Sequence, residues 1–213
     1  MSDPAATADF TSVGFFARAR ERLLPGVPLP ADESPGDHRL NPDFLADVTA
    51  FVDAAVLIPV VARDPEATLI LTQRTANLAA HAGQISFPGG KVDAGDADPA
   101  AAAMREANEE IGLAPSSVSV VGYLAPYLSR TGFRIQPVVG RVEPGFALSV
   151  NPEEVVDAFE VPLSFLMNPA NHRRGTRRFA GRDRYFYEMP FGDRYIWGVT
   201  AGILRELYEQ LFA

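Results

Sequence analysis

One short segment concentrates the residues whose chemistry stands out. "MREANEEIGL" (104–113) places Glu106, Glu109 and Glu110 beside Arg105. At about 100° per residue on an α-helix, the three carboxylates fall within an arc of about 100°. Like charges at these spacings repel by roughly 0.2–0.5 kcal/mol per pair, and a hard divalent cation would turn that repulsion into attraction. The pattern is consistent with a metal-binding face and also with a solvated acidic face.

The ends of this helix can be placed from its flanking residues. Asp98 is a good N-cap, Pro99 suits the first helical position, and Gly112 suits a left-handed C-terminal position. These signals predict a helix over 99–111. Its apolar residues lie on another face: Ala100, Met104, Ala107 and Ile111. We therefore expect the helix to pack one side into the core and to present the three carboxylates on the other.

A glycine pair precedes the acidic helix. Gly89 and Gly90 follow Phe87 and Pro88, at what reads as the end of a short strand. Glycines let backbone groups approach a ligand or a metal closely, although a tight turn uses them equally well. The pair is a candidate binding element.

Composition limits the function classes. The chain has 213 residues, 47% of them hydrophobic, with a net charge of −8 and a pI near 4.9. An acidic chain of this kind argues against nonspecific nucleic-acid binding, but a bound metal could still attract a small anionic substrate. The absence of cysteine excludes disulfides, zinc–thiolate sites and cysteine nucleophiles.

No segment predicts membrane insertion or export. No apolar run approaches the roughly 20 residues that a membrane helix needs. The N-terminal "MSDPAATADF" lacks a basic region followed by an apolar one. We expect a cytoplasmic protein.

The first fifty residues read as an extension. Residues 9–24 predict a helix with Phe15, Ala19 and Leu23 on one stripe, capped by Asp9 or Thr11. The Pro-rich 25–37 reads as a linker or surface crossing. The predicted organisation is an N-terminal helix and Pro-rich extension over 1–50, followed by the main domain over 51–213.

The main body alternates strands with few long helices. Residues 64–66 suggest a hairpin turn, 75–98 a loop-rich segment, and 151–166 a polar turn followed by apolar packing. A closing amphipathic helix is predicted over 199–212, with Ile203, Leu207 and Leu211 on its apolar stripe. The expected strands are 54–63, 67–74, 118–125, 133–142, 184–190 and 194–198. This order fits an α/β fold with helices packed on a mixed sheet.

The glycine loop and the acidic helix together resemble the Nudix box. Its general form is Gly-x5-Glu-x7-Arg-Glu-U-x-Glu-Glu-x-Gly-U, where U is aliphatic. The matching residues here are Gly90, Arg105, Glu106, Glu109, Glu110, Gly112 and Leu113. Arg105 lies one residue later than in the general box. The position of the box's first glutamate therefore depends on the end from which it is counted. Counted back from Arg105 it is Ala97, and counted forward from Gly90 it is Asp96.

The upstream segment is similar to the coenzyme A pyrophosphatase branch of the Nudix hydrolases. That branch carries Leu-Thr-x-Arg-x3-Leu-x2-His-x-Gly-Gln-x2-Phe-Pro-Gly-Gly and a box one residue longer, with an Asp where Asp96 stands. The matching residues are Leu71, Thr72, Arg74, Leu78, His81, Gly83, Gln84, Phe87, Pro88, Gly89 and Gly90. The resemblance covers roughly 54–212 and implies a Nudix-like α/β/α sandwich with a mixed β-sheet.

The resemblance implies a reaction and a metal site. The reaction would be hydrolysis of the diphosphate of coenzyme A or its derivatives to 3′,5′-ADP and 4′-phosphopantetheine or its acyl form. Glu106, Glu109 and Glu110 would hold Mg²⁺ or Mn²⁺, with the carbonyl of Gly90 as a further ligand. Arg105 would orient the carboxylates by ion pairing.

The resemblance leaves the general base open. It would be a glutamate of the box, such as Glu109, or one from a distant loop, Glu153 or Glu154 of "NPEEV". Of the two distant residues we favour Glu154. Acidic residues are also common at a helix N-terminus, so the pair alone does not identify a base.

Three further residues are candidate substrate contacts. Arg74, His81 and Gln84 could bind the substrate's phosphates or pantetheine, although a loop histidine is often only a structural hydrogen-bonding group. The run "HRRGTRRFAGRDR" (172–184) carries six arginines and could meet the 3′-phosphate of coenzyme A. A solvated loop or a subunit contact, as in a homodimer, explains it equally well.

Two other functions compete with this interpretation. One is a Nudix hydrolase acting on another nucleotide-diphosphate substrate, such as ADP-ribose, NADH or a nucleoside triphosphate. The other is a noncatalytic ligand-binding module. The intact Arg-Glu-x-x-Glu-Glu helix argues against the module, because binding a ligand does not require three convergent carboxylates. The expected partner is a small molecule, with neither nucleic acid nor membrane.

Overall fold

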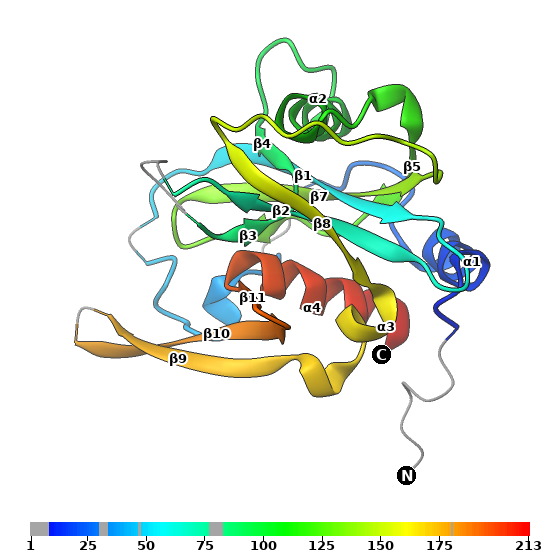
Figure 1. Ribbon diagram of the computed structural model, residues 1–213. Helices are drawn as coiled ribbons and strands as arrows, with labels where there is room; N and C mark the ends of the chain where they lie inside the picture. Colours follow the sequence, from blue (N-terminus) through cyan, green and yellow to red (C-terminus); the bar gives the residue numbers. More distant parts are fainter. Residues whose placement is uncertain (1–8, 30–33, 47, 77–82, 180) are drawn as a thin grey trace.

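A mixed sheet lies at the centre of the molecule, with helices on both faces (Figure 1). The computed structural model describes residues 9–29, 34–46, 48–76, 83–179 and 181–213. Helix α2 covers one face of the sheet, and α1 and α4 lie on the other. The predicted α/β/α sandwich is confirmed.

The central sheet has eight strands, in which β1 and β7 pair in parallel and the other pairs are antiparallel. The strands are β1 (Val52–Val61), β2 (Thr68–Arg74), β3 (Ile85–Ser86), β4 (Gly89–Lys91), β5 (Val118–Tyr123), β6 (Tyr127–Leu128), β7 (Phe133–Val142) and β8 (Val155–Pro162). β1 and β2 form the predicted hairpin around residues 64–66. The parallel β1–β7 pair makes the sheet mixed, as expected.

Alternating residues of β1 divide the core into two layers. Ile58 and Val60 pack with α1 and α4, whereas Leu57 and Val61 pack with α2. Successive side chains of a strand point to opposite faces, so a strand that is apolar throughout must be covered on both sides. This explains why the helices flank the sheet rather than share one face.

The structure describes four α-helices and three short 3₁₀ helices. They are α1 (Ser12–Arg22), α2 (Pro99–Ile111), α3 (Leu163–Leu166), α4 (Val199–Phe212), η2 (Asp37–Arg39), η3 (Pro115–Ser117) and η4 (Pro169–Asn171). The predicted bounds of α2 and α4 are confirmed. Helix α1 is shorter than predicted, because Thr11 caps it by accepting a hydrogen bond from the Gly14 amide and Leu23 is already extended.

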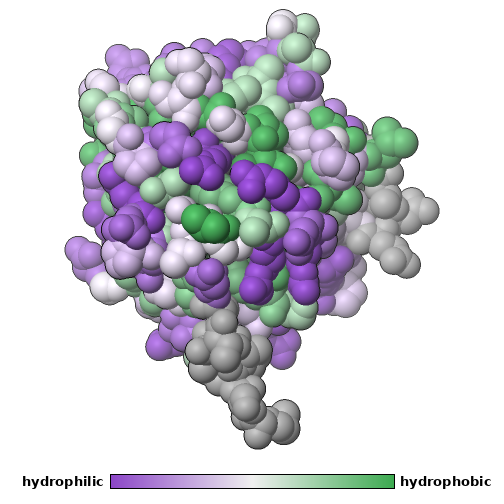
Figure 2. Space-filling model, turned by 90° about the vertical axis from the view of Figure 1, so that its right-hand side faces the viewer, coloured by the Kyte–Doolittle hydropathy of each residue, from purple (hydrophilic) through white to green (hydrophobic). Residues whose placement is uncertain are grey.

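Helix α1 contributes to the main core. Phe15 and Phe16 are fully buried in the layer that contains α4, whereas Val13 is 78% exposed. Figure 2 views the molecule from this side, where hydrophilic residues cover much of the surface and smaller hydrophobic areas interrupt them. The extension predicted for residues 1–50 therefore includes a helix that the core requires for its packing.

A second, three-stranded sheet lies below the first in Figure 1. Its strands are β9 (Arg173–Phe179), β10 (Arg182–Phe191) and β11 (Arg194–Trp197). The predicted pairing of 184–190 with 194–198 is confirmed. The reading of 172–184 as a solvated loop is wrong, because most of it forms β9 and the start of β10. No residue of β9 is buried, so the strand has no apolar alternation by which a sequence could reveal it.

The segment 75–98 holds two short strands, where a loop was predicted. The glycine pair follows the end of a short strand, as expected, because β3 ends at Ser86 and Gly89 then begins β4. Strands of two and three residues are too short to show an alternating pattern. Among the described residues, no helix combines the length and apolar character needed to cross a bilayer.

Candidate active site

Helix α2 is held at both ends as its sequence predicts. The Asp98 carboxylate accepts a hydrogen bond of 2.8 Å from the Ala101 amide. Gly112 ends the helix in the left-handed region at φ 69°. Ala103, Ala107 and Ile111 are fully buried against the sheet. These contacts fix the rotation of the helix and therefore the directions of its glutamates.

The three glutamates differ strongly in exposure. The exposed fraction of the side chain is 1% for Glu110, 17% for Glu106 and 52% for Glu109. The expectation that all three are presented away from the core is wrong for Glu110. It lies about 40° from Glu106 toward the apolar side of the helix, so the core reaches it.

Glu110 is a buried carboxylate with two partners. Its Oε1 lies 3.3 Å from Nη1 of Arg74, and its Oε2 accepts a hydrogen bond of 3.2 Å from the Gly89 amide. Burial raises its pKa to about 7, against the lowering effect of these two partners. The site thus contains a carboxylate whose negative charge is incompletely compensated at neutral pH.

Gly90 lies directly against Glu106. A Cβ atom on Gly90 would stand 2.4 Å from the carboxyl carbon of Glu106, so any larger residue there would displace the Glu106 carboxylate. Burial raises the pKa of Glu106, and its hydrogen bond with Arg105 opposes the rise. The glycine pair and the acidic helix, separate in sequence, are in contact.

Arg105 holds the carboxylates together. Its guanidinium forms two hydrogen bonds with Asp96, of 3.0 and 3.1 Å, and also contacts Glu106 at 2.8 Å and Glu109 at 3.1 Å. The hydrogen bonds from Arg105 hold the pKa of Asp96 below its usual value. Asp96, which stands at the distance from Gly90 that the box gives to its first glutamate, therefore fixes the position of the Arg105 guanidinium.

The C-terminal end of α2 positions Glu154. The amides of Ser149 and Asn151 donate to the carbonyls of Ile111 and Glu110, which as helix-end groups lack helical partners. This brings Glu154 so close that its charge raises the pKa values of both Glu106 and Glu110. Glu154 is half-buried, and the neighbouring glutamate, residue 153, is exposed. We call the four glutamates 106, 109, 110 and 154 the acidic cluster.

A cavity of about 530 Å³ lies beside the acidic cluster, between the two sheets. Arg74, Gln84, Gly89 and Gly90 form part of its wall. Among the residues that the structure describes, none of the acidic cluster lines the cavity directly; Glu106 and Glu110 instead contact the glycines that do. The structure brings these predicted residues to one place.

Two further residues, Gln84 and His81, were predicted to contact the substrate. The carbonyl of Gln84 accepts a hydrogen bond of 2.9 Å from the Arg74 amide, and this bond joins the upstream motif to β2. His81 lies outside the described residues.

The cavity wall also contains three arginines, two of them from the arginine-rich run 172–184. Arg130, Arg177 and Arg184 line it, and we call these three residues the arginine wall. Phe44 and Trp197 lie beside them. The six arginines of 172–184 were a signal for two of the three. Nothing in the sequence indicated Arg130 or Phe44, because they come from distant segments.

The donor set fits a hard divalent cation. Carboxylate and backbone carbonyl oxygens are the ligands that such ions prefer, and the buried Glu110 lacks a full counter-charge. Within the described ranges, no three acidic or histidine side chains are gathered as a ligand set. Glu106 and Glu109 are turned toward Arg105 and Glu110 toward Arg74, so binding would require these carboxylates to reorient.

Comparison with known proteins agrees with this geometry. The model of the NUDIX domain matches residues 53–180. The chain is 44% identical over 172 residues to the Nudix hydrolase NudL of Citrobacter koseri, covering 81% of this chain and 89% of the relative. It is 40% identical over 172 residues to the NudL of Escherichia coli K12, with the same coverage.

A solved structure supports the fold. The Deinococcus radiodurans protein DR0079 aligns with a TM-score of 0.50 at 16% identity, covering 76% of this chain and 87% of that one. At this identity the likeness speaks for the architecture alone. Together with the sequence matches and the site geometry, it leads to one conclusion: this chain belongs to the Nudix family and is a hydrolase acting on phosphoric anhydrides.

Proposed function

We propose that the protein hydrolyses the diphosphate of coenzyme A or its derivatives to 3′,5′-ADP and 4′-phosphopantetheine or its acyl form. One observation carries this proposal. Arg74, Gln84, Gly89 and Gly90, which belong to the motif resembling the coenzyme A branch, line one cavity, and the acidic cluster lies directly behind its glycines. A diphosphate at this edge of the cavity would be next to the carboxylates of the Nudix box.

Nudix hydrolases generally use divalent metal ions, and we assign Mg²⁺ or Mn²⁺ to this site. Glu106, Glu109 and Glu110 would hold the ion, with the Gly90 carbonyl as a further ligand. When bound, the cation would neutralise charge on the diphosphate oxygens. The expected location of the enzyme is the cytoplasm.

The chain's own residues orient the groups and move the proton. Arg105 keeps Glu106 and Glu109 in place through its contacts with both. We assign Glu154 as the general base that takes a proton from the attacking water. The water oxygen bonds to one phosphorus, the bond from that phosphorus to the bridging oxygen breaks, and the second phosphate leaves. His81 and Gln84 would contact the substrate, and Arg74 would join them while holding Glu110.

A substrate panel tests the proposal. Purified protein is incubated with coenzyme A, ADP-ribose, NADH or deoxynucleoside triphosphates, each with Mg²⁺ or Mn²⁺, and the products are separated by chromatography. The expected result is 3′,5′-ADP and 4′-phosphopantetheine from coenzyme A, with the highest kcat/KM in the panel. Rapid cleavage of ADP-ribose with inert coenzyme A would overturn the assignment of the substrate.

A further inference from the structure

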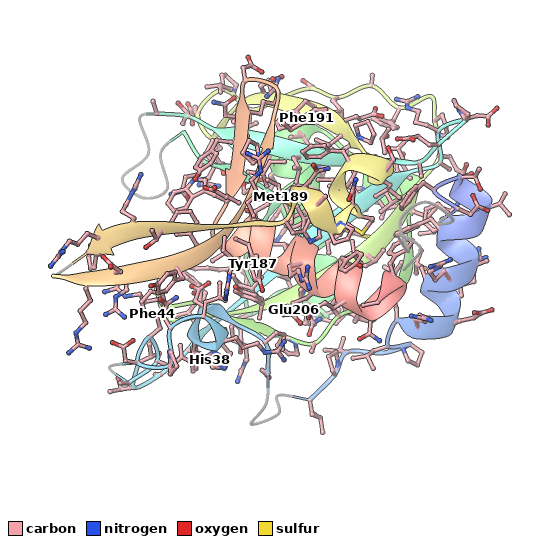
Figure 3. All side chains as sticks on the ribbon, turned by 90° about the horizontal axis from the view of Figure 1, so that it is seen from below. His38, Phe44, Tyr187, Met189, Phe191 and Glu206 are labelled. Carbon is pink, nitrogen blue, oxygen red and sulfur yellow. The ribbon has the colours of Figure 1, made fainter. Side chains whose placement is uncertain are left out.

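The arginine wall belongs to three separate parts of the chain. Arg177 and Arg184 come from β9 and β10, and Arg130 comes from the turn before β7. In Figure 3, which views the molecule from below, Phe44 lies beside the β9–β10 hairpin. Phe44 and Arg177 are more than a hundred residues apart in sequence, so distant segments of the chain meet at this wall.

Among the described residues, two of these guanidinium groups form no ion pair, although burial raises the pKa of the nearby Asp37 and the charge of Arg130 opposes that rise. Arg184 pairs with Asp43 at 2.6 Å. Within the part of the chain that the structure describes, neither Arg130 nor Arg177 has a carboxylate oxygen within 4.0 Å. The chain has 27 acidic and 19 basic side chains, so carboxylates are not scarce. Unpaired cations lining a cavity of such a chain suit an anionic ligand.

Aromatic rings hold the guanidinium groups in place. The Arg130 guanidinium lies 4.6 Å from the ring centre of Phe179 and 5.3 Å from that of Phe44. The Arg177 guanidinium lies 5.5 Å from the ring centre of Trp197. A guanidinium stacked on a ring keeps the N–H donors at its edge available.

Arg184 adds a further unused donor. Its Nε is buried and has no hydrogen-bond partner among the described residues, although its Nη1 contacts Asp43. Buried donors are normally satisfied, so this one marks a guanidinium that the surrounding residues do not fully saturate. The wall therefore offers both positive charge and free N–H groups.

We propose that the arginine wall binds a second phosphate of the substrate, a phosphomonoester on the nucleoside that is separate from the diphosphate. This deepens the proposed function and rests on it for the position of the diphosphate. A phosphomonoester has several strong acceptor oxygens, which suit the convergent N–H donors of Arg130 and Arg177. The wall then selects nucleotides that carry the additional phosphate over otherwise identical nucleotides that lack it.

The first test compares coenzyme A with 3′-dephospho-coenzyme A as substrates. The wild-type protein should prefer coenzyme A by about 10- to 100-fold in kcat/KM, the range expected for hydrogen bonds between charged groups. Arg177→Gln should remove most of this preference by raising the KM for coenzyme A, with kcat/KM for the dephospho compound nearly unchanged. Arg177→Lys should restore part of the preference.

Arg178→Gln is the matched control. Arg178 is the next residue of β9 and is exposed, and among the described residues its side chain donates a hydrogen bond to the carbonyl of Gly181 and does not line the cavity. This variant should keep the wild-type preference. Equal losses for both substrates in Arg177→Gln, or an unchanged preference, would overturn the proposal.

A binding measurement separates this proposal from the proposed reaction. Isothermal titration calorimetry in EDTA compares adenosine 3′,5′-bisphosphate with 5′-AMP, and circular dichroism confirms that each variant is folded. Tighter binding of the bisphosphate that depends on Arg177 supports the subsite even if coenzyme A is not hydrolysed. Hydrolysis of coenzyme A with equal binding of the two nucleotides would retain the reaction and reject the subsite.

Discussion

The acidic cluster and the arginine wall lie on different sides of one cavity and hold their charges in different ways. Two glutamates of the cluster, Glu106 and Glu110, are largely buried, and both are paired with arginines. Two of the three arginines in the wall, Arg130 and Arg177, are exposed and rest on aromatic rings, with no carboxylate oxygen within 4.0 Å among the described residues. The carboxylates of the cluster are paired with arginines of the protein, whereas the wall leaves its charge available to a ligand.

The acidic cluster and the arginine wall also depend on different parts of the fold. The acidic cluster comes mainly from one helix, and its exposed fractions follow from how that helix is rotated. The arginine wall exists only because β9, β10 and the turn at Arg130 meet in space. We therefore expect changes to the cluster to affect turnover itself, and changes to the wall to affect the choice of substrate.

The largest effect is expected at Glu110. Glu110→Gln should lower kcat by about 10³-fold, comparable to losing a central electrostatic contact in an active site. The melting temperature should stay the same or rise, because glutamine removes a charge that burial disfavours. Steady-state kinetics and calorimetry on the same sample measure both quantities. Glu109→Gln should also lower kcat, and retained activity in both variants would remove the metal assignment.

Glu154 and Glu153 form a matched pair in the same loop. Glu154→Gln should lower kcat by about 10²-fold with little change in KM, because it deletes the assigned general base. Glu153→Gln should leave both unchanged, since that side chain is exposed and its charge is not among those that shift the site's pKa values. Equal effects in the two variants would contradict the assignment of Glu154.

Substitution of Arg105 tests how far its ion pairs stabilise the carboxylates around it. Arg105→Met should lower the free energy of unfolding by about 1–3 kcal/mol, because Asp96, Glu106 and Glu109 lose a shared partner. Activity should fall by about 10- to 100-fold, as expected when a group that orients ligands is lost. Urea denaturation and kcat/KM provide the readouts.

Arg105→Lys is the control for charge. It should recover less than half of the lost stability, since lysine cannot make the two parallel contacts with Asp96. Full recovery by lysine would show that the charge alone matters, and not the forked geometry.

The smallest effect concerns pH in the metal-free protein. Burial raises the pKa of Glu110 to about 7 from an ordinary value of 4.5, so the folded state binds this proton more tightly than the unfolded chain does. Stability from this group is therefore present below pH 4.5 and is lost as the pH rises through 7. In EDTA, the melting temperature of wild type relative to Glu110→Gln should fall by about 5–10 °C between pH 5 and pH 8. A constant difference would contradict the raised pKa.

Much of the fold was predictable because its signals are local. The bounds of α2 and α4 follow from a capping residue, a glycine and an apolar stripe, each within a few residues of the helix. The long strands β1, β2 and β7 were apparent from their apolar content. Strand β9 was missed because every one of its side chains is at least partly exposed. Strand β4 was missed because it is only three residues long, and the two-residue β3 was expected only as the end of a short strand without bounds.

The residues that could do the chemistry are apparent from local patterns: a helix with three carboxylates in one arc, and a glycine pair before it. How each of them is used depends on the folded arrangement. It buried Glu110 and left Glu109 half-exposed, placed Gly90 against Glu106, and made Asp96 the partner of Arg105. The physical reason is that helix formation depends on neighbours a few residues away. Burial, pKa and the shape of a cavity depend on segments that are distant in the chain and meet only when it folds.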